Sequence, residues 1–237
     1  MSAIQGARER ARAEVTAAIK EEARRQVARE GAVKLSLRAV ARELGMVSSA
    51  LYRYFPSRDD LLTALIVDAY DALGAAAEGA LATADGREPL ERWSAVCRAV
   101  REWALAHPHE YALIYGSPVP GYSAPQATVV PASRVALALL TVVLDAHAAG
   151  ALRAPEGAVV PEAVGADARA LAGTLGIELP EAALTGFTAA WAQLFGLVSF
   201  EVFGQFNKVV EAREEFFAHA VAALGRATGL PWTSQSD

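Results

Sequence analysis

The sequence predicts an all-α protein with a small N-terminal domain, residues 1–60, and a larger C-terminal helical domain, residues 61–237. Alanine, a strong helix former, is abundant in the chain. Apolar residues recur at intervals of three and four in long segments, as they do on one face of a helix. No segment alternates apolar and polar residues as a half-buried strand does.

Charge separates the two expected domains. Residues 1–60 carry twelve Lys and Arg against eight Asp and Glu, a net charge of +4, whereas the whole chain carries −5 and the remainder therefore −9. This asymmetry indicates a polyanionic partner for the N-terminal domain alone. Chance asymmetry in a helical protein would explain the same charges equally well.

The first four expected helices follow from their apolar spacing and their end signals. They cover residues 8–30, 37–44, 47–55 and about 58–81. Gly31 and Gly45 end the first two helices, and Pro56 cannot continue the third. Ser36 and Ser57 are expected N-caps of the helices that follow them.

Six further helices are expected, with proline at several of their starts. They cover residues 89–107, 108–115, 125–149, 161–172, 180–206 and 208–228, with a kink near Pro131 in the third of them. Residues 116–125 form a Pro- and Gly-rich loop.

The compartment is expected to be the cytoplasm, without a membrane contact. Cys97 is the single cysteine, so neither an internal disulfide nor a Cys-based zinc site can form. The charged N-terminus differs from a signal peptide. The apolar run over residues 194–206 is interrupted by Glu201 and is too short to cross a bilayer.

Residues 43–62, ELGMVSSALYRYFPSRDDLL, place polar, aromatic and basic side chains directly after a glycine turn. A short helix, a glycine turn and a second short helix form a helix-turn-helix, whose second helix enters the DNA major groove. The apolar residues expected to hold this unit together are Val40, Leu44, Leu51 and Phe55. A surface helical hairpin with solvated polar side chains would show the same pattern.

A longer segment, SLRAVARELGMVSSALYRYFPSRDDLL, closely resembles the DNA-binding motif of the TetR (tetracycline-repressor) family. The residues that carry the resemblance are Ser36, Leu37, Ala41, Leu44, Gly45, Leu51, Tyr52, Tyr54, Phe55, Ser57, Arg58 and Leu61. The resemblance covers about residues 10–60. It implies a DNA-binding N-terminal domain followed by a helical ligand-binding and dimerisation domain.

The resemblance also implies DNA-contacting roles for individual residues. Tyr52, Tyr54 and Arg58 would contact phosphates, and Arg38 would contact a phosphate or a base edge. The residues expected to face bases are Ser48, Ser49, Ala50 and Arg53. Three positions depart from the family pattern: Val47 replaces a frequent Ser, Ala50 a frequent Thr, and Tyr54 a common His. Direct readout would therefore depend on Arg53 and Arg38.

The segment over residues 103–125 gathers aromatic and His residues near one helix junction, and it resembles the WHG subgroup of TetR-like regulators. A packed junction is one interpretation, and an effector pocket is the other. The expected pocket residues are Trp103, His107, Tyr111, Tyr115 and Trp191. The expected effector is apolar or aromatic, and neutral or cationic, because no Lys or Arg lies between Arg101 and Arg134.

No metal, cofactor or catalytic site is expected. His107 and His109 flank Pro108 and do not share a helix face, and no third ligand follows them. The sequence has no Gly-x-Ser-x-Gly motif and no phosphate-binding loop. An enzyme is therefore not indicated.

The last two long helices are expected to form a homodimer, as the family resemblance implies. The segment 187–202 carries a wide apolar stripe, with Phe187, Trp191, Leu194, Phe195, Val198 and Val202. Gly196 and Gly204 are expected to permit close helix approach, although an inner bundle helix would show a similar stripe.

These features predict a ligand-responsive transcriptional regulator, most often a repressor in this family, that leaves a palindromic double-stranded DNA operator when an effector binds. The alternative is a ligand-binding or interaction module without specific DNA binding.

Overall fold

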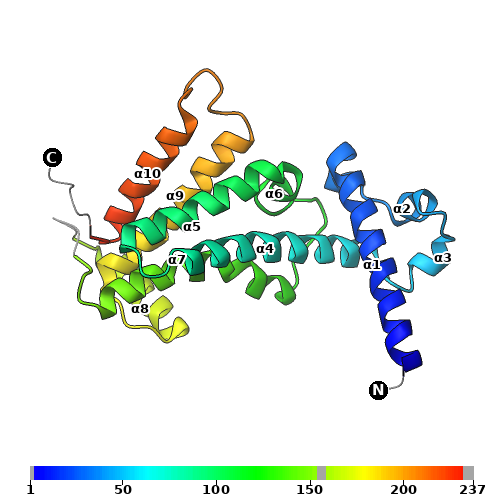
Figure 1. Cartoon of the computed structure of the whole chain (residues 1–237), viewed down its shortest axis with the longest axis horizontal. Coiled ribbons are helices and arrows are strands. Elements are labelled where there is room, and N and C mark those ends of the chain that lie inside the picture. Colours follow the sequence, from blue (N-terminus) through cyan, green and yellow to red (C-terminus); the bar gives the residue numbers. More distant parts are fainter. Residues whose placement is uncertain (1–2, 154–158, 232–237) are drawn as a thin grey trace. The chain divides into compact units, whose positions relative to one another are not determined.

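The computed structural model describes residues 3–153 and 159–231, and the described residues form helices joined by turns and loops, without a strand (Figure 1). The prediction of an all-α fold is confirmed. The elements are α1 Ala3–Glu30, η1 Ala32–Lys34, α2 Leu37–Glu43, α3 Ser48–Leu51, α4 Arg58–Thr83, α5 Pro89–Ala106, α6 Pro108–Tyr115, η2 Gln126–Thr128, α7 Val129–Ala148, α8 Glu162–Leu175, α9 Glu181–Val202 and α10 Arg213–Ala227.

The chain forms two compact units. The first unit contains Met1–Ala72 and His107–Ala132, and the second contains Leu73–Ala106 and Ser133–Asp237. Helix α4 is continuous between them and contributes residues to each. The division of function at residue 60 stays a prediction, since these units are defined by packing alone.

The core of the first unit joins α1 to the helix-turn-helix and to the start of α4. Its buried residues are Ile19, Ala23, Val27, Leu35, Leu37, Val40, Ala41, Leu51, Phe55, Leu61, Leu62, Leu65 and Ile66. Val40, Leu51 and Phe55 are therefore core residues, as predicted, and Leu44 packs against them partly buried.

Both serine N-caps are present. The Ser36 hydroxyl accepts a hydrogen bond from the backbone N–H of Ala39 at 3.4 Å. The Ser57 hydroxyl accepts from the N–H of Asp60 at 3.1 Å and donates to the Asp60 carboxylate at 2.7 Å. Val47 stands at the N-cap of α3 without a side-chain bond, so Ser48 does not replace the missing cap.

The third predicted helix, 47–55, is wrong in length. Regular helix covers only Ser48–Leu51, and the chain then tightens, because the N–H of Arg53 bonds to the carbonyl of Ala50, three residues earlier. Pro56 disfavours helical geometry in the residue before it, so the segment ends in turns. We call residues 48–55 the recognition segment.

Two other predicted helices end differently. The segments 180–206 and 208–228 are Glu181–Val202 and Arg213–Ala227 in the structure. Gly204 has φ 79° and Lys208 has φ 63°, and these left-handed residues turn the chain between the helices. Gly204 therefore lies in a turn just after α9, and its role in close helix approach stays a prediction.

Pro131 lies in the first turn of α7, where its missing N–H leaves no helix bond unmade. Pro131 therefore has no reason to kink α7, and the helix runs without a break from Val129 to Ala148.

Helices α5, α9 and α10 pack together in the second unit through buried polar contacts as well as apolar ones. The Trp93 indole N–H donates to the carbonyl of Val221 at 2.9 Å. Arg101 donates two hydrogen bonds to Glu201, both at 2.7 Å, and its guanidinium lies 5.4 Å from the Phe217 ring centroid. The hydrogen bonds that Arg101 donates to the Glu201 carboxylate raise the pKa of Arg101.

Among the described residues, two helical segments, Gln126–Ala148 (η2 and α7) and Glu181–Val202 (α9), are long and apolar enough to cross a membrane by length and composition alone. The second segment includes most of the run 194–206, which is too short by itself to cross a bilayer. Core helices of water-soluble bundles pass the same test, so this is weak evidence for a membrane contact.

We expect the Arg101–Glu201 pair to be essential for the stability of the second unit. The two side chains are only 12% and 6% exposed, so Glu201→Ala leaves a largely buried guanidinium without the acceptor of its two hydrogen bonds. Removing one partner of such a pair costs about 3–5 kcal/mol of unfolding free energy. Thermal and urea unfolding measure this loss.

The control for this substitution is Glu162→Ala, which removes an ion pair whose carboxylate side chain is 88% exposed. It should change the unfolding free energy by less than about 0.5 kcal/mol. The double variant Arg101→Met/Glu201→Leu should recover most of the loss, because apolar residues often replace buried pairs without penalty. Equal unfolding curves for Glu201→Ala and Glu162→Ala would contradict the prediction.

Candidate functional site

The recognition segment has one buried apolar side and one exposed polar side. Leu51 is fully buried and Phe55 is 7% exposed, so the segment is held from beneath. Ser49, Tyr52 and Arg53 are exposed. Ser48, Ala50 and Tyr54 are partly buried. The structure thus brings six of the eight predicted DNA-contacting residues onto one short segment.

The other two predicted DNA-contacting residues, Arg38 and Arg58, border a cleft beside that segment. The cleft has a volume of about 460 Å³. Its lining residues are Leu35, Ser36, Leu37, Arg38, Tyr52, Pro56, Ser57 and Arg58. Arg38 is exposed at the start of α2, so its guanidinium is accessible to a phosphate or a base edge.

Arg58 is bonded within the protein. Its Nε donates to the carbonyl of Leu35 at 3.2 Å, and its second terminal nitrogen donates to the carbonyls of Ala32 at 2.8 Å and Val33 at 3.3 Å. Its remaining terminal nitrogen pairs with Asp59 at 3.1 Å. These bonds tie the start of α4 to the turn between α1 and α2. A phosphate contact by Arg58 stays a prediction.

Arg12, which the sequence did not single out, contacts the recognition segment from α1. Its guanidinium donates to the carbonyl of Arg53 at 3.4 Å and lies 5.0 Å from the Tyr54 ring centroid. The two partners are separated from Arg12 by about forty residues, so no local sequence pattern could have indicated the contact.

The expected effector residues are divided between the two units. Tyr111 and Tyr115, on α6, have ring centroids 5.1 Å apart, and Tyr115 meets Tyr70 of α4 edge to face at 6.0 Å. Burial raises the pKa of Tyr115 and of Tyr70, so both phenols are neutral at pH 7. We call Tyr70, Tyr111 and Tyr115 the tyrosine cluster.

The remaining expected effector residues lie around or apart from this cluster. His107 is the N-cap residue of α6. Trp103 and Trp191 belong to the second unit, where Trp103 is buried and Trp191 packs edge to face on Phe195 at 6.2 Å. A pocket lined by all five residues stays a prediction.

A groove of about 310 Å³ lies between α1 and α6 within the first unit. Its lining residues are Val27, Ala28, Gly31, Ala32, Val33, His109, Ala112, Leu113, Ser117, Pro118 and Val119. His109 therefore borders an apolar surface. Within residues 3–153 and 159–231, no group of three or more His, Cys, Asp or Glu could hold a metal ion.

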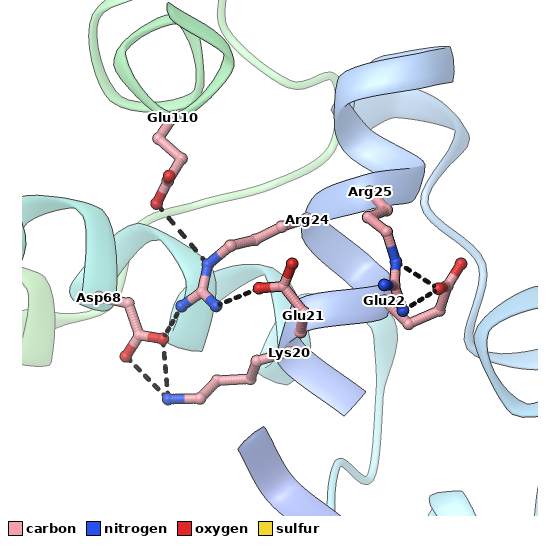
Figure 2. A network of polar contacts seen from close by, with 7 residues as sticks. All are labelled: Lys20, Glu21, Glu22, Arg24, Arg25, Asp68 and Glu110. Atoms are coloured by element: carbon pink, nitrogen blue, oxygen red, sulfur yellow. Dashed lines mark hydrogen bonds and ion pairs between the residues drawn. The ribbon is translucent and has the colours of Figure 1, made fainter. Parts of the chain in front are cut away.

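An ion-pair network joins α1 to α4 and α6 (Figure 2). Asp68 of α4 accepts hydrogen bonds from Lys20 at 2.8 Å and from Arg24 at 2.5 Å. Arg24 also lies 3.4 Å from Glu21 and 3.6 Å from Glu110 of α6. The Arg24 Nε is buried and has no hydrogen-bond partner, because 3.6 Å exceeds a hydrogen-bond distance.

Comparison with known proteins gives these features a family. Residues 93–224, more than half of the chain, match the family model described as "Tetracyclin repressor-like, C-terminal domain". Residues 19–65 match the model described as "Bacterial regulatory proteins, tetR family". The chain belongs to the TetR family.

Curated relatives agree with this assignment. The HTH-type transcriptional regulator Rv1816 of Mycobacterium tuberculosis is 42% identical over 207 residues, which cover 85% of this chain and 86% of that protein. The regulator Mb1846 of Mycobacterium bovis matches to the same extent. This TetR-family protein is accordingly a DNA-binding transcriptional regulator and not an enzyme.

Solved structures share the fold. The protein SCO4313, described as a regulatory protein, is 35% identical, with a TM-score of 0.75 over 91% of this chain and 97% of that one. RolR, solved in complex with resorcinol, is 17% identical, with a TM-score of 0.51 over 96% and 100% of the two chains. The likeness to RolR concerns the fold alone. The WHG subgroup stays an expectation.

We expect the main effect of Arg58→Ala to be a loss of stability in the first unit of this TetR-family protein, and not the loss of a DNA contact. The substitution leaves the carbonyls of Ala32, Val33 and Leu35 without their donor. Such a loss costs about 1–3 kcal/mol of unfolding free energy, and thermal unfolding measures it.

Arg38→Ala is the matched control, since Arg38 is exposed and borders the same cleft. It should leave the melting temperature unchanged and weaken binding to the operator. An Arg58→Ala protein that melts like the wild type but binds DNA weakly would instead assign Arg58 to phosphate contact.

Proposed function

We propose that this TetR-family regulator represses transcription from a palindromic operator, which it binds as a dimer, and that an uncharged apolar or aromatic molecule releases it. The proposal is supported chiefly by the attachment of the recognition segment to α1, because α1 is also bonded to two helices that carry the tyrosine cluster. A small molecule that moves α4 or α6 can therefore move α1 and, with it, the recognition segment.

Base reading in this proposal depends on Arg53. Its side chain is exposed on the recognition segment, where Ser48, Ser49 and Ala50 provide only short contacts. Arginine can bind guanine through two hydrogen bonds, and alanine can contact only a thymine methyl. Tyr52 is 41% exposed, and its hydroxyl is suited to a phosphate contact.

The dimer interface that we propose uses the exposed faces of α9 and α10. Phe187, Leu194 and Val198 of the predicted apolar stripe are buried within their own unit, so they belong to the bundle core. The opposite face of α9 exposes Ala189, Gln193, Gly196 and Phe200, spaced as neighbours on one side of a helix.

Gly196 supports this choice of face. A Cβ built on Gly196 meets no atom within 4 Å in the described chain, so a second copy can approach the helix backbone there. Phe200 is 52% and Phe216 38% exposed, and both rings contact Phe206 edge to face, so they form one exposed apolar surface of the kind that a partner covers. Two heads related by a two-fold axis require inverted half-sites about one helical turn apart, or a multiple of it.

Effector release in this proposal begins at the tyrosine cluster. A molecule that inserts among neutral, mostly buried aromatic rings would itself be apolar or aromatic and uncharged. Its binding must favour one arrangement of α4 and α6 over another, because a ligand with equal affinity for both arrangements shifts nothing. A cytoplasmic location is consistent with a DNA operator as partner.

The ion-pair network would carry this displacement to α1. Glu110 directly precedes Tyr111 on the eight-residue helix α6, and Asp68 lies two residues before Tyr70 on α4. Of the three carboxylates around Arg24, those of Asp68 and Glu110 are thus attached to the helices that hold the tyrosine cluster. A shift of about 0.5 Å would bring Glu110 within hydrogen-bond distance of the Arg24 Nε. We infer that Arg24 responds to the position of α6.

Selection of binding sites from random DNA tests the base reader. Arg53→Ala should relax the preference at one base pair of each half-site, losing roughly 1–3 kcal/mol of discrimination. Tyr52→Phe should weaken all sequences alike, because a phosphate contact carries no sequence information. If both variants keep the wild-type consensus and affinity, the recognition segment does not read the operator.

Operator release tests the network. A thermal-shift screen of uncharged aromatic compounds, such as phenols and dihydroxybenzenes, identifies molecules that bind the full-length protein. In the absence of DNA, the Glu110→Gln variant should bind these molecules as tightly as the wild type does. The same molecules should release less of this variant from the operator. The change should be at least about fivefold, the lower range of allosteric couplings.

Glu21→Gln is the matched control, because Glu21 contacts the same guanidinium from within α1. It should release the operator like the wild type. Equal release by the wild type, Glu110→Gln and Glu21→Gln would remove the network from the mechanism without affecting the repressor proposal.

A further inference from the structure

Helix α1 extends well before the part of the chain that matches the family model. Its 28 residues span about 42 Å, and the match begins only at residue 19. Residues 3–18 are helical and precede that match. Figure 1 shows the N-terminal end of α1 continuing beyond the level of α2 and α3. We call residues 3–18 the N-terminal extension.

Arg12 places the extension directly beside the recognition segment. It is bonded to the carbonyl of Arg53 at 3.4 Å, and its guanidinium lies 5.0 Å from the Tyr54 ring centroid. The recognition segment faces DNA in this family, so the side of α1 that carries Arg12 lies at the edge of the DNA-binding surface. The extension therefore has a defined position relative to that surface.

Arg8 lies on the same face of α1, one turn further toward the N-terminus. Residues four apart are neighbours on a helix surface, and the rise between them is about 6 Å. Arg8 is exposed and forms no ion pair with the residues that the structure describes. Glu14 lies on another face of the helix, and Glu9, three residues before Arg12, lies at the edge of the face of Arg8 and Arg12 without forming an ion pair with the residues that the structure describes.

We propose that Arg8 binds a backbone phosphate of the operator outside the base pairs that the recognition segment reads, and that Arg12 positions the extension for this contact. A guanidinium donates two parallel hydrogen bonds to phosphate oxygens. The contact recognises duplex DNA by its charge and carries no base preference. It rests on the DNA-binding function of the family and adds a second point of attachment for each protomer.

The experiment compares full-length variants on two duplexes that carry the operator selected by the wild-type protein. The short duplex ends at the outer base pairs of the half-sites, and the long duplex adds about one helical turn of arbitrary sequence on each side. Fluorescence anisotropy gives the dissociation constants at several salt concentrations. Circular dichroism confirms that each variant folds.

On the long duplex, Arg8→Ala should bind less tightly than the wild type whatever the flanking sequence. The slope of log affinity against log salt should fall in magnitude by about one for each protomer, as expected for one lost phosphate contact. Arg8→Ala and the wild type should bind the short duplex alike. Arg8→Lys should retain most of the slope, because it retains the charge.

Arg10→Ala is the matched control. Arg10 is exposed and lies on the opposite face of α1, four residues before Glu14. It should bind both duplexes like the wild type. If Arg8→Ala and Arg10→Ala show the same affinity and the same salt slope on the long duplex, the proposal is wrong, although the regulator would still bind its operator.

A double-mutant cycle tests the positioning role of Arg12. Arg12→Ala and Tyr54→Leu should have non-additive effects on affinity for the long duplex, because they remove two sides of one contact. Arg8→Ala and Tyr54→Leu should also be non-additive, because losing the Arg12–Tyr54 contact removes the position from which Arg8 reaches its phosphate, whereas Arg10→Ala and Tyr54→Leu should be additive. Additivity of Arg12→Ala with Tyr54→Leu would overturn the positioning role.

Discussion

The burial of one face of α1 is the contact on which the rest of the first unit depends. Ile19 and Ala23 are fully buried and Val27 is 9% exposed, at the four-residue spacing that forms a continuous stripe. The recognition segment contains only four residues of regular helix, which would not be stable alone in water. Its shape must come from packing Leu51 and Phe55 into the same core.

The same helix carries charge away from that stripe. Lys20 and Arg24 reach Asp68 with side chains 24–29% exposed, so solvent screens these pairs and their net contribution to stability is modest. Their directional bonds nevertheless relate α1 to α4 and α6. A regulator needs such a contact, because an interaction that is strong and rigid would hold one state only, whereas a modest one can change with an effector.

The second unit is stabilised differently. Arg101 and Glu201 are almost completely buried, and Trp93 donates to a backbone carbonyl across α5 and α10. Buried ionic and polar groups carry a high desolvation cost unless every partner is present. They therefore specify one arrangement of α5, α9 and α10, and that arrangement leaves the opposite face of α9, with Gly196 and Phe200, exposed.

The sequence by itself determined the features whose causes are local. Apolar periodicity predicted the helices, and the Ser36 and Ser57 caps lie within three residues of their partners. The internal bonds of Arg58 and the contact of Arg12 with Tyr54 were decided by the tertiary structure alone. These contacts join residues more than twenty positions apart, and only the burial of the α1 stripe brings them within bonding distance.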